Sequence, residues 1–360
     1  MSVPLKVLLA AGGTGGHLFP AEALANALIA RGAEVDLVSD DRATVYADKF
    51  PAKLHQVTSG TVTGSGFFGK LKGVYALYRG TRESRKLLAR LKPDVVVGFG
   101  GYPTVPPLYA AATSGIPSLI HEQNAVMGRA NRFLAPKVRA IATGFPLKDT
   151  TFAAKSSVVG NPVRPPVLAA AEVAFPGFEH GLRLLVTGGS QGARIMSDIV
   201  PPAVAMLTAE ERARLTVTQQ ARAEDVERVR AAYGAAGVQA TVEPFFKDLP
   251  ARIAASHLVI GRSGASTVSE LAVIGRAAIL VPLPGSLDQD QAANARVLEN
   301  AEAAILQPQP EFTPEWLSGQ LAAALANPAG LAQKAANARS AAVPDAAERL
   351  ADLVFRTAGR

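Results

Sequence analysis

The stretch Val186-Thr-Gly-Gly-Ser-Gln-Gly-Ala-Arg194 and its earlier counterpart Leu9-Ala-Ala-Gly-Gly-Thr-Gly-Gly-His17 determine the fold that the sequence predicts. Each stretch follows a short apolar run typical of a strand and precedes an Ala-rich segment typical of a helix. A strand, a glycine-rich turn and a helix begin a nucleotide-binding α/β unit. The glycines permit a tight turn close to a ligand, and the helix start favours an anion such as a phosphate. Two such units, about half a chain length apart, predict two Rossmann-like parallel-sheet domains that face a central cleft.

The composition is that of a globular protein with more than one core. The chain has 360 residues, of which 48% are hydrophobic and 19% charged. Cysteine is absent, which excludes a disulfide framework, a thiolate zinc site and a cysteine nucleophile. The formal net charge of +7 favours acidic partners such as phosphates, nucleic acid or anionic lipid.

The sequence contains no segment that predicts membrane insertion. No run of about 18 apolar residues occurs, so we expect no transmembrane helix. The N-terminus leads directly into a strand, without the charged start and apolar segment of a secretion signal. We therefore expect the protein to reside in the cytoplasm.

Strands and helices alternate along both halves, which predicts parallel sheets. In the first half we expect strands at 6–10, 34–39, 95–99, 118–122 and 138–143. In the second half we expect them at 183–187, 214–218, 238–242, 257–261, 277–281 and 303–306. The Pro-rich stretch Asn161–Pro166 marks the domain boundary. We assign 1–163 to the first domain and 164–342 to the second, and expect a last helix at about 343–358 to pack back on the first.

The loop Gly12-Gly-Thr-Gly-Gly-His17 is the first candidate site. A dinucleotide fingerprint requires G-x-G-x-x-G, but from Gly13 the third position is Leu18. Asp40, after the second strand, still offers a ribose contact, so this alternative stays open. An isolated histidine is most often a core residue. Here the loop brings His17 to the mouth of the cleft, where a base with a pKa near neutrality is useful, and we therefore favour a catalytic role.

Polar residues follow two further strands of the first half. His121-Glu-Gln-Asn124 comes directly after a buried strand, at the edge where open α/β sheets bind ligands. The alternative is a capped helix start with Asn124 as the N-cap residue. Gly100-Gly-Tyr-Pro103 follows the neighbouring strand and has a plain turn as its alternative.

Gly261-Arg-Ser-Gly-Ala-Ser-Thr-Val-Ser-Glu270 is the strongest element of the second half. Small residues at this helix start suit a diphosphate, and Glu270 lies close enough to accept hydrogen bonds from ribose hydroxyls. The alternative for Glu270 is pairing with the helix dipole alone. Asp288-Gln-Asp-Gln291 begins the helix after the next strand, with a solvated helix start as its alternative. No His or Cys reinforces this pair of aspartates, so we predict no catalytic metal.

Residues 64–92 combine basic and apolar side chains. One interpretation is a surface helix whose apolar side packs in the core. The other is an interfacial patch that binds anionic lipid by charge and apolar insertion. The residues of this predicted membrane patch are Phe67, Phe68, Lys70, Leu71, Lys72, Val74, Tyr78, Arg79 and Arg82. Nucleic acid is not expected as a partner, because aromatic residues are few and no nucleic-acid module is present.

Taken together, these motifs resemble the MurG family. The motifs that carry the resemblance run in the family's order from about residue 10 to about residue 295. They are Gly-Gly-Thr-Gly-Gly-His17, Gly-Gly-Tyr-Pro103, His-Glu-Gln-Asn124, Gly-Asn-Pro-Val-Arg164, Gly-Gly-Ser-Gln-Gly-Ala193 and Arg-Ser-Gly-Ala-Ser-Thr-Val-Ser-Glu270. The resemblance implies a two-domain GT-B glycosyltransferase without a cofactor. It would move N-acetylglucosamine, with inversion, to the C4 hydroxyl of undecaprenyl-pyrophosphoryl-N-acetylmuramoyl-pentapeptide at the cytoplasmic face of the inner membrane.

The resemblance also implies the substrate contacts. It places the donor, UDP-N-acetylglucosamine, mainly on the second domain and the acceptor on the first, near His17, Tyr102, Glu122 and the loop after Ser59. The implied donor contacts are Thr14, Gly15, Gly16, Asn124, Arg164, Ser190, Phe246, Ala265, Ser266, Thr267, Val268, Ser269, Glu270 and Gln291. The backbone contact with uracil falls at Phe245 or Phe246, and we favour Phe246.

The chain departs from the family pattern in two places. It has Thr218-Gln219-Gln220 where relatives often show His-Gln, and we predict no role there. Asp288-Gln-Asp aligns only loosely, which weakens the sugar contacts expected before Gln291.

Four other functions remain as alternatives. A glycolipid transferase would use a different acceptor, and a UDP-N-acetylglucosamine 2-epimerase would convert the free donor. A nicotinamide oxidoreductase would bind its cofactor at the first loop. The broken fingerprint and the second glycine loop argue against this alternative. A non-catalytic nucleotide-binding module would leave the grouping of His17, Tyr102 and Glu122 unexplained.

Overall fold

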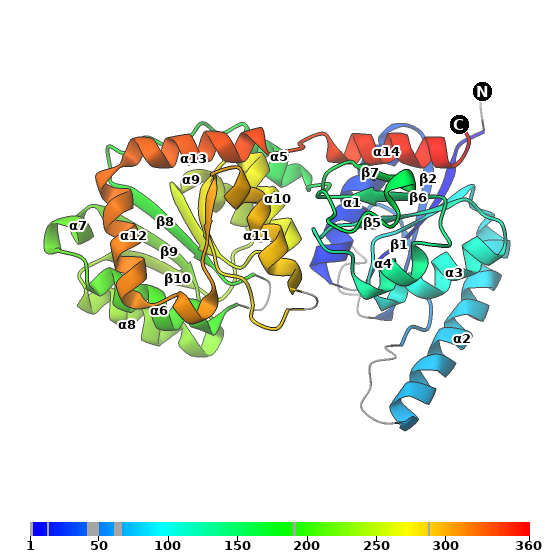
Figure 1. Cartoon of the computed structure of the whole chain (residues 1–360), viewed down its shortest axis with the longest axis horizontal. Helices are drawn as coiled ribbons and strands as arrows, with labels where there is room; N and C mark the ends of the chain where they lie inside the picture. The colour runs from blue at the N-terminus through cyan, green and yellow to red at the C-terminus, as the bar shows by residue number, and fades with distance from the viewer. Residues whose placement is uncertain (1–2, 13, 42–49, 61–66, 190–191, 287–288) are drawn as a thin grey trace. The chain divides into compact units, whose positions relative to one another are not determined.

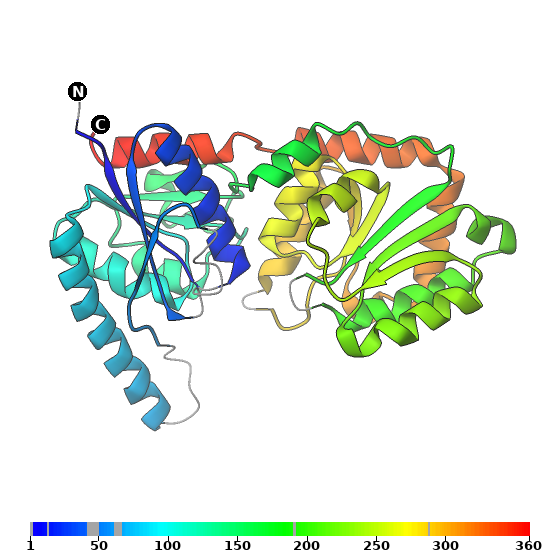
Figure 2. The ribbon, with the colours of Figure 1, turned by 180° about the vertical axis from the view of Figure 1, so that it is seen from behind.

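The computed structural model describes residues 3–12, 14–41, 50–60, 67–189, 192–286 and 289–360, with the side chains of 67–72 outside the description. The chain divides into two compact units (Figures 1 and 2). Unit 1 comprises Met1–Arg164 and Pro344–Arg360, and unit 2 comprises Pro165–Val343.

Unit 1 is built on a parallel sheet. Among its described residues the sheet has seven strands in the order β3-β2-β1-β4-β5-β6-β7. The strands are β1 (Lys6–Ala10), β2 (Glu34–Ser39), β3 (Lys53–Gln56), β4 (Val95–Gly98), β5 (Ser118–Glu122), β6 (Ala140–Thr143) and β7 (Ser156–Val158). The helices are α1 (Gly15–Ala30), α2 (Phe67–Leu91), α3 (Val105–Thr113), α4 (Arg129–Leu134) and α14 (Ala346–Thr357), and the 3-10 turns are η2 (Tyr102–Thr104) and η3 (Ala153–Lys155).

Helices cover both faces of this sheet because successive side chains of a strand point to opposite faces. In β1, Val7 and Leu9 pack in the core beneath α1 and α14. Leu8 and Ala10 pack in the other core, against α2, α3 and α4. The two layers are visible in Figure 1. Near-continuous apolar strands, as the sequence has at 95–98, are therefore required by burial on both faces.

Unit 2 repeats this plan. Among its described residues the parallel sheet has six strands in the order β10-β9-β8-β11-β12-β13. The strands are β8 (Leu182–Thr187), β9 (Leu215–Gln220), β10 (Gln239–Glu243), β11 (Leu258–Gly261), β12 (Ala277–Leu280) and β13 (Ala304–Leu306). The helices are α5 (Pro165–Ala171), α6 (Arg194–Ala205), α7 (Ala209–Ala213), α8 (Val226–Ala235), α9 (Leu249–Ala255), α10 (Ala265–Ile274), α11 (Asp290–Asn300), α12 (Pro314–Ala326) and α13 (Pro328–Ser340), with 3-10 turns η4 (Ala223–Asp225) and η6 (Gln309–Glu311).

The prediction of two Rossmann-like parallel-sheet domains is confirmed. The six strands of unit 2 lie within two residues of their predicted bounds. Two edge strands of unit 1, β3 and β7, were not predicted, because neither shows the apolar run of a buried strand. Their residues are largely half-buried or exposed, so their sequences carry little strand signal.

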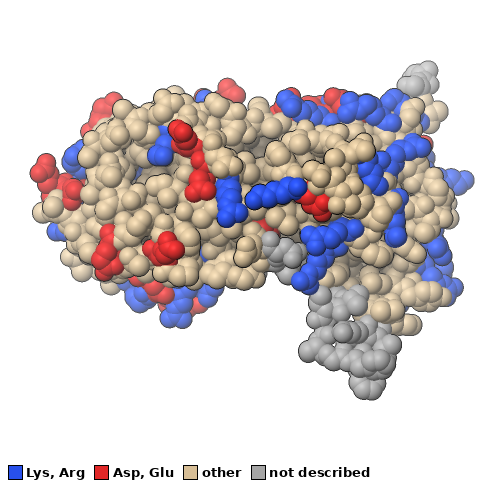
Figure 3. All heavy atoms as spheres, in the orientation of Figure 1, with Lys and Arg blue, Asp and Glu red and all other residues tan. Residues whose placement is uncertain are grey.

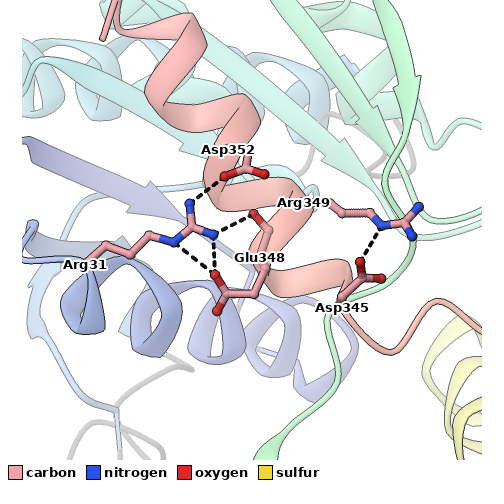
Figure 4. A network of polar contacts seen from close by, with 5 residues as sticks. All are labelled: Arg31, Asp345, Glu348, Arg349 and Asp352. Atoms are coloured by element: carbon pink, nitrogen blue, oxygen red, sulfur yellow. Dashed lines mark hydrogen bonds and ion pairs between the residues drawn. The ribbon is translucent and has the colours of Figure 1, made fainter.

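The last helix belongs to unit 1, where α14 packs against α1. Leu350 and Val354 are fully buried in the core that α1 and β1 share. Arg31, at the end of α1, bridges Glu348 and Asp352, which lie one turn apart on α14, and its Nη1 is 2.6 Å from Asp352 Oδ1 (Figure 4). Both carboxylates are more than half exposed, so the apolar contact contributes most of the free energy that holds α14 against α1. The ion pairs fix the direction in which α14 lies along α1.

A buried arginine connects the C-terminal ends of α9 and α10 in unit 2. Arg276, at the start of β12, is 1% exposed. Its guanidinium donates to Ile274 O and Gly275 O at the end of α10, at 3.0 and 2.7 Å, and to Ala254 O in the last turn of α9. Helix C-terminal carbonyls carry partial negative charge, which compensates a cation at this position. Arg276 therefore ties α9 and α10 together at the edge opposite to the strand ends.

A buried histidine is the next-to-last residue of β5 in unit 1. His121 is fully buried, and its Nε2 lies 3.0 Å from Gly160 O while its Nδ1 lies 3.1 Å from Gln123 Nε2. Gly160 accepts and the Gln123 amide donates, which fits the neutral ring protonated at Nε2. Burial lowers the pKa of His121 to about 4, although the bond to Gly160 opposes the shift. The ring is therefore a neutral core residue at physiological pH.

This assignment predicts a pH dependence of stability. The folded-state pKa lies below the unfolded value of about 6.5, so the contribution of His121 is complete above that value and is lost as the pH falls toward 4. We expect the wild type to lose about 2 kcal/mol more than His121→Gln between pH 7 and pH 5. Urea unfolding of both proteins at both pH values measures the difference, and equal losses would contradict a neutral buried His121.

Candidate functional site

The strand order of unit 1 reverses between β1 and β4, which is where open α/β sheets bind ligands. The loops after these two strands meet, and Gly12 N donates to Gly100 O at 3.3 Å. Gly100 and Gly101 have φ values of +86° and +77°, which other residues rarely adopt. Glycine is thus required at this turn, and the predicted Gly100–Pro103 motif lies beside the first glycine loop.

His17 lies in the first turn of α1, between the two loops. A Cβ atom on Gly12 would lie 3.4 Å from Nδ1 of His17, and one on Gly100 would lie 3.4 Å from Nε2. The ring therefore packs directly against both glycines. Thr14, the N-cap residue of α1, places its Oγ1 2.8 Å from Nδ1 of His17. The half-buried imidazole is thus held at the switch point of the sheet.

Glu122 ends β5 and is 2% exposed. Its Oε1 accepts from the backbone and side-chain N–H groups of Asn124 at 3.0 and 3.2 Å. Its Oε2 accepts from Gly128 N at 2.9 Å and from Asn131 Nδ2 at 2.8 Å. Burial raises the pKa of Glu122, and these hydrogen bonds counteract the shift. The carboxylate therefore organises the turn from residue 122 to residue 131, with Asn124 half-buried beside it.

Tyr102 lines a groove of about 710 Å³ within unit 1. The groove runs along Thr58, Ser59 and Gly60 to α2, and Gly60 is the described part of the loop after Ser59, where the acceptor is expected. On its wall, Glu83 accepts from Thr58 N at 2.7 Å and from Arg79 Nε at 2.8 Å. Burial opposes the shift, but these hydrogen bonds prevail and lower the pKa of Glu83. This wall of the groove therefore carries an ion pair between Glu83 and Arg79, which the hydrogen bond from Thr58 holds in place.

Arg164 ends the first segment of unit 1 and lies over Phe19 of α1. Its guanidinium carbon is 3.9 Å from the centre of the Phe19 ring, a cation–π contact. The neighbouring Glu22 has a raised pKa because of burial, which the charge of Arg164 opposes. A Cβ atom on Gly15 would lie 2.9 Å from the Phe19 ring, so Arg164 lies over the face of α1 that Gly15 shares.

In unit 2 the strand order reverses between β8 and β11, so the second glycine loop also lies at a switch point. A Cβ atom on Gly188 would lie 2.0 Å from Ala193 N, so the loop folds back on itself too closely for any side chain there. Gly189 and Gly192 both have positive φ. Ser190, a predicted donor contact, lies outside the described residues.

The start of α10 lies across this switch point. Gly264 is the N-cap residue, and Ala265 begins the helix. Ser266 and Thr267 are half-buried, whereas Ser269 and Glu270 are 7% and 9% exposed. Val268 is fully buried and its N–H donates to Gly264 O, so no group of this predicted contact is exposed.

The remaining predicted donor contacts follow β10 and β12. Phe246 is 5% exposed and packs 4.3 Å from the guanidinium of Arg252, whereas Phe245 is 59% exposed. Gln291, in the first turn of α11, accepts from Leu283 N at 3.0 Å through Oε1. Asp288, which aligned loosely, lies outside the described residues.

Two residues at the carboxyl ends of the unit 2 strands bind neighbouring loops, which the sequence does not predict. Arg262 donates to Val281 O and Pro282 O at 3.0 Å each, and burial lowers its pKa. It therefore holds the end of β12 beside α10. Gln220, at the end of β9, is 5% exposed and bonds to the second glycine loop. A strand-terminal glutamine gives no sequence signal that distinguishes such an anchor from a solvated residue.

The predicted membrane patch lies on α2. Val74 and Tyr78 are 56% and 60% exposed, and Tyr75, not included in the prediction, is 65% exposed. Leu77 instead packs against the core, so the apolar residues of this helix divide between the core and the surface. Arg79 and Arg82 are exposed, and Lys and Arg recur over the unit 1 surface in Figure 3. The side chains of Phe67, Phe68, Lys70, Leu71 and Lys72 lie outside the description.

The described helices include none that combines the length and the hydropathy needed to cross a bilayer.

Residues 7–143 match the N-terminal domain of glycosyltransferase family 28, and residues 183–350 match its C-terminal domain. A UDP-N-acetylglucosamine--N-acetylmuramyl-(pentapeptide) pyrophosphoryl-undecaprenol N-acetylglucosamine transferase from Allorhizobium ampelinum is 56% identical over 351 residues, which cover 97% of this chain and 94% of the relative. The protein of the same name from Methylobacterium sp. strain 4-46 is 58% identical over 98% of this chain and 96% of its own length.

The crystal structure of Acinetobacter baumannii MurG superposes with a TM-score of 0.81 at 31% identity, over 98% of this chain and all of that one. Sequence and fold thus agree over nearly the whole length of the chain. The chain therefore belongs to the MurG family of N-acetylglucosaminyltransferases, within glycosyltransferase family 28.

Proposed function

We propose that this protein transfers N-acetylglucosamine from UDP-N-acetylglucosamine to the C4 hydroxyl of undecaprenyl-pyrophosphoryl-N-acetylmuramoyl-pentapeptide, with inversion. The observation that carries this proposal is the identity of 54–58% with relatives named for this transfer, over 96–98% of the chain. The reaction is a step of peptidoglycan synthesis, and through it the protein would contribute to cell shape and cell division.

The donor would bind mainly to unit 2. The Gly264 N-cap and the small residues Ala265 and Ser266 leave the N-terminus of α10 accessible to a diphosphate, which the helix dipole favours. Glu270 would accept hydrogen bonds from the ribose hydroxyls. The backbone at Phe246 or Phe245 would meet the uracil. The other proposed donor contacts are Thr14, Gly15, Gly16, Asn124, Arg164, Ser190, Thr267, Ser269 and Gln291.

His17 is the proposed general base. The acceptor hydroxyl would attack the anomeric carbon from the face opposite UDP while His17 removes its proton. For Nε2 of His17 to accept that proton, Nδ1 must carry the other one and donate it to Thr14 Oγ1, which lies 2.8 Å away. Thr14 would therefore set the tautomer. The α10 N-terminus and Arg164 would stabilise the diphosphate that leaves.

The acceptor would bind to unit 1. The groove at Tyr102, Ser59 and Gly60, of about 710 Å³, has the volume for part of a glycopeptide and is lined by polar groups that can bind it. Glu122 is proposed here as a support for the acceptor side, because its buried carboxylate fixes the turn that carries Asn124.

The protein would act as a peripheral protein on the cytoplasmic face of the inner membrane. The exposed face of α2, with Val74, Tyr75 and Tyr78 beside Arg79 and Arg82, offers apolar insertion and attraction to anionic lipid. Such contact would bring unit 1 close to the lipid-linked acceptor.

The deciding experiment measures UDP release from UDP-N-acetylglucosamine with and without a soluble short-chain analogue of the acceptor. We expect release only when the acceptor is present, because the leaving diphosphate requires an attacking hydroxyl. Conversion of the donor without acceptor would favour the 2-epimerase alternative. Absence of any turnover would favour a non-catalytic nucleotide-binding module, and fluorescence titration with NADH tests the oxidoreductase alternative.

Replacement of the proposed base is expected to affect turnover far more than donor binding. His17→Ala should lower kcat by about 10²–10⁴-fold, the usual contribution of a general base. The dissociation constant for UDP, measured by calorimetry, should stay within about threefold. His180→Ala, at an exposed turn of unit 2, is the matched control and should leave both quantities unchanged. Near-normal kcat in His17→Ala would remove His17 from this role.

Membrane binding is expected to depend on the exposed face of α2. Arg82→Gln should weaken binding to vesicles with anionic phospholipid about fivefold, since one basic residue contributes about 1 kcal/mol at such a surface. Tyr75→Ser/Tyr78→Ser should weaken it further because apolar insertion is lost. Val173→Ser/Met206→Ser removes apolar side chains of unit 2 that are 50% and 53% exposed, and it should have no effect in the same sedimentation assay. Equal losses in both double variants would argue against a patch on α2.

A further inference from the structure

Gln220 uses all four hydrogen-bonding positions of its side-chain amide at the edge of unit 2. Oε1 accepts from Thr187 Oγ1 at 3.0 Å and from Gly188 N at 3.1 Å. Nε2 donates to Gly189 O at 3.1 Å and to Pro244 O at 3.2 Å. The two carbonyl partners can only accept, which fixes the orientation of the amide. A buried amide with every position occupied has one stable placement.

These four bonds connect three segments that come from different strands. Thr187 ends β8, and Gly188 and Gly189 begin the second glycine loop. Gln220 ends β9, and Pro244 follows β10. The pairing of β8 with β9 and of β9 with β10 places these ends side by side. One side chain therefore joins the glycine loop to the segment that contains Phe245 and Phe246.

The contact with Pro244 also fixes a peptide plane. In a trans peptide the carbonyl and the following N–H point in opposite directions, and the described chain contains no cis bond. When Pro244 O points at Gln220, the N–H of Phe245 must point away from it. The same amide holds Gly189 O, which also accepts from Gly192 N at 3.1 Å. Gln220 thus orients backbone groups that follow β8 and β10, the two strands beside its own.

We infer that Gln220 is a positioning residue that couples the second glycine loop to the Pro244–Phe246 segment. The diphosphate of a uridine nucleoside diphosphate would then meet oriented backbone groups of the loop, and its uracil would meet those of the Pro244–Phe246 segment. The inference rests on the proposed function, because it assumes that UDP binds to unit 2. Gln220 acts through the backbone that it holds and has no contact with the ligand of its own.

The test is UDP binding by isothermal titration calorimetry on the full chain, with thermal unfolding measured in parallel. Gln220→Glu keeps the accepting oxygen but turns a second oxygen toward the carbonyls of Gly189 and Pro244. We expect it to weaken UDP binding by about tenfold or more near neutral pH. Gln219→Glu is the matched control, because Gln219 is also buried and bonds to Tyr233 of α8 instead. It should lower the melting temperature and leave UDP affinity within about twofold.

Acidification gives a readout that a purely structural role would not move. Once protonated, the carboxyl group that Gln220→Glu introduces regains a donor for one carbonyl, so the affinity of this variant relative to wild type should recover as the pH falls. Gln220→Met, which loses all four bonds, should bind weakly at every pH and provides a second variant if the first does not fold. Wild-type affinity in Gln220→Met, or equal weakening in Gln219→Glu, would overturn the inference. Failure of the wild type to bind UDP would overturn the proposed function instead.

Discussion

The parallel pairing of β1 with β2 and β4 is the constraint on which the site of unit 1 depends. Parallel strands end at the same edge, so the residues after Ala10, Ser39 and Gly98 must emerge side by side. The strand order reverses at β1 and β4, which separates the crossing helices and leaves the loop ends accessible. This arrangement brings Gly12 into contact with Gly100 and places His17 against both glycines. Unit 2 obeys the same rule at β8 and β11.

Polar groups that are buried or, in the case of Arg262, half-buried just behind these edges hold the loops in place. Glu122 binds the turn before α4, Gln220 binds the second glycine loop, and Arg262 binds the chain after β12. A buried polar group without partners costs about 1–3 kcal/mol, so each of these side chains strongly disfavours any other loop conformation. Glycine loops have high conformational freedom and few side chains to pack. The buried anchors supply the definition that the glycines cannot.

The sequence predicts the sheets well because buried parallel strands are nearly continuous apolar runs, as in Val95–Gly98. It also predicts the glycine loops, since these depend on local residue types, whereas the catalytic role of His17 stays a prediction. It does not predict β3 or β7, whose residues alternate little and remain partly exposed. Nor does it predict the role of Gln220 or the burial of the Glu122 carboxylate, because these depend on contacts between segments far apart in the chain. Periodicity reports which face is buried, whereas partners of a buried amide depend on tertiary packing.

The two switch points have the same topology but carry different chemistry. After β1 the helix begins with an imidazole in its first turn, supported by a threonine hydroxyl on Nδ1. After β11 the helix begins with Gly264, Ala265 and Ser266, which offer backbone N–H groups and little side chain. Proton transfer needs a titratable group at a fixed position, whereas binding of a diphosphate needs dipoles and close approach. One fold can therefore supply both functions when the residues at the helix starts differ. Under the proposed function, the buried anchors would keep each set of groups oriented before substrate arrives, which is the condition for electrostatic stabilisation of a leaving diphosphate.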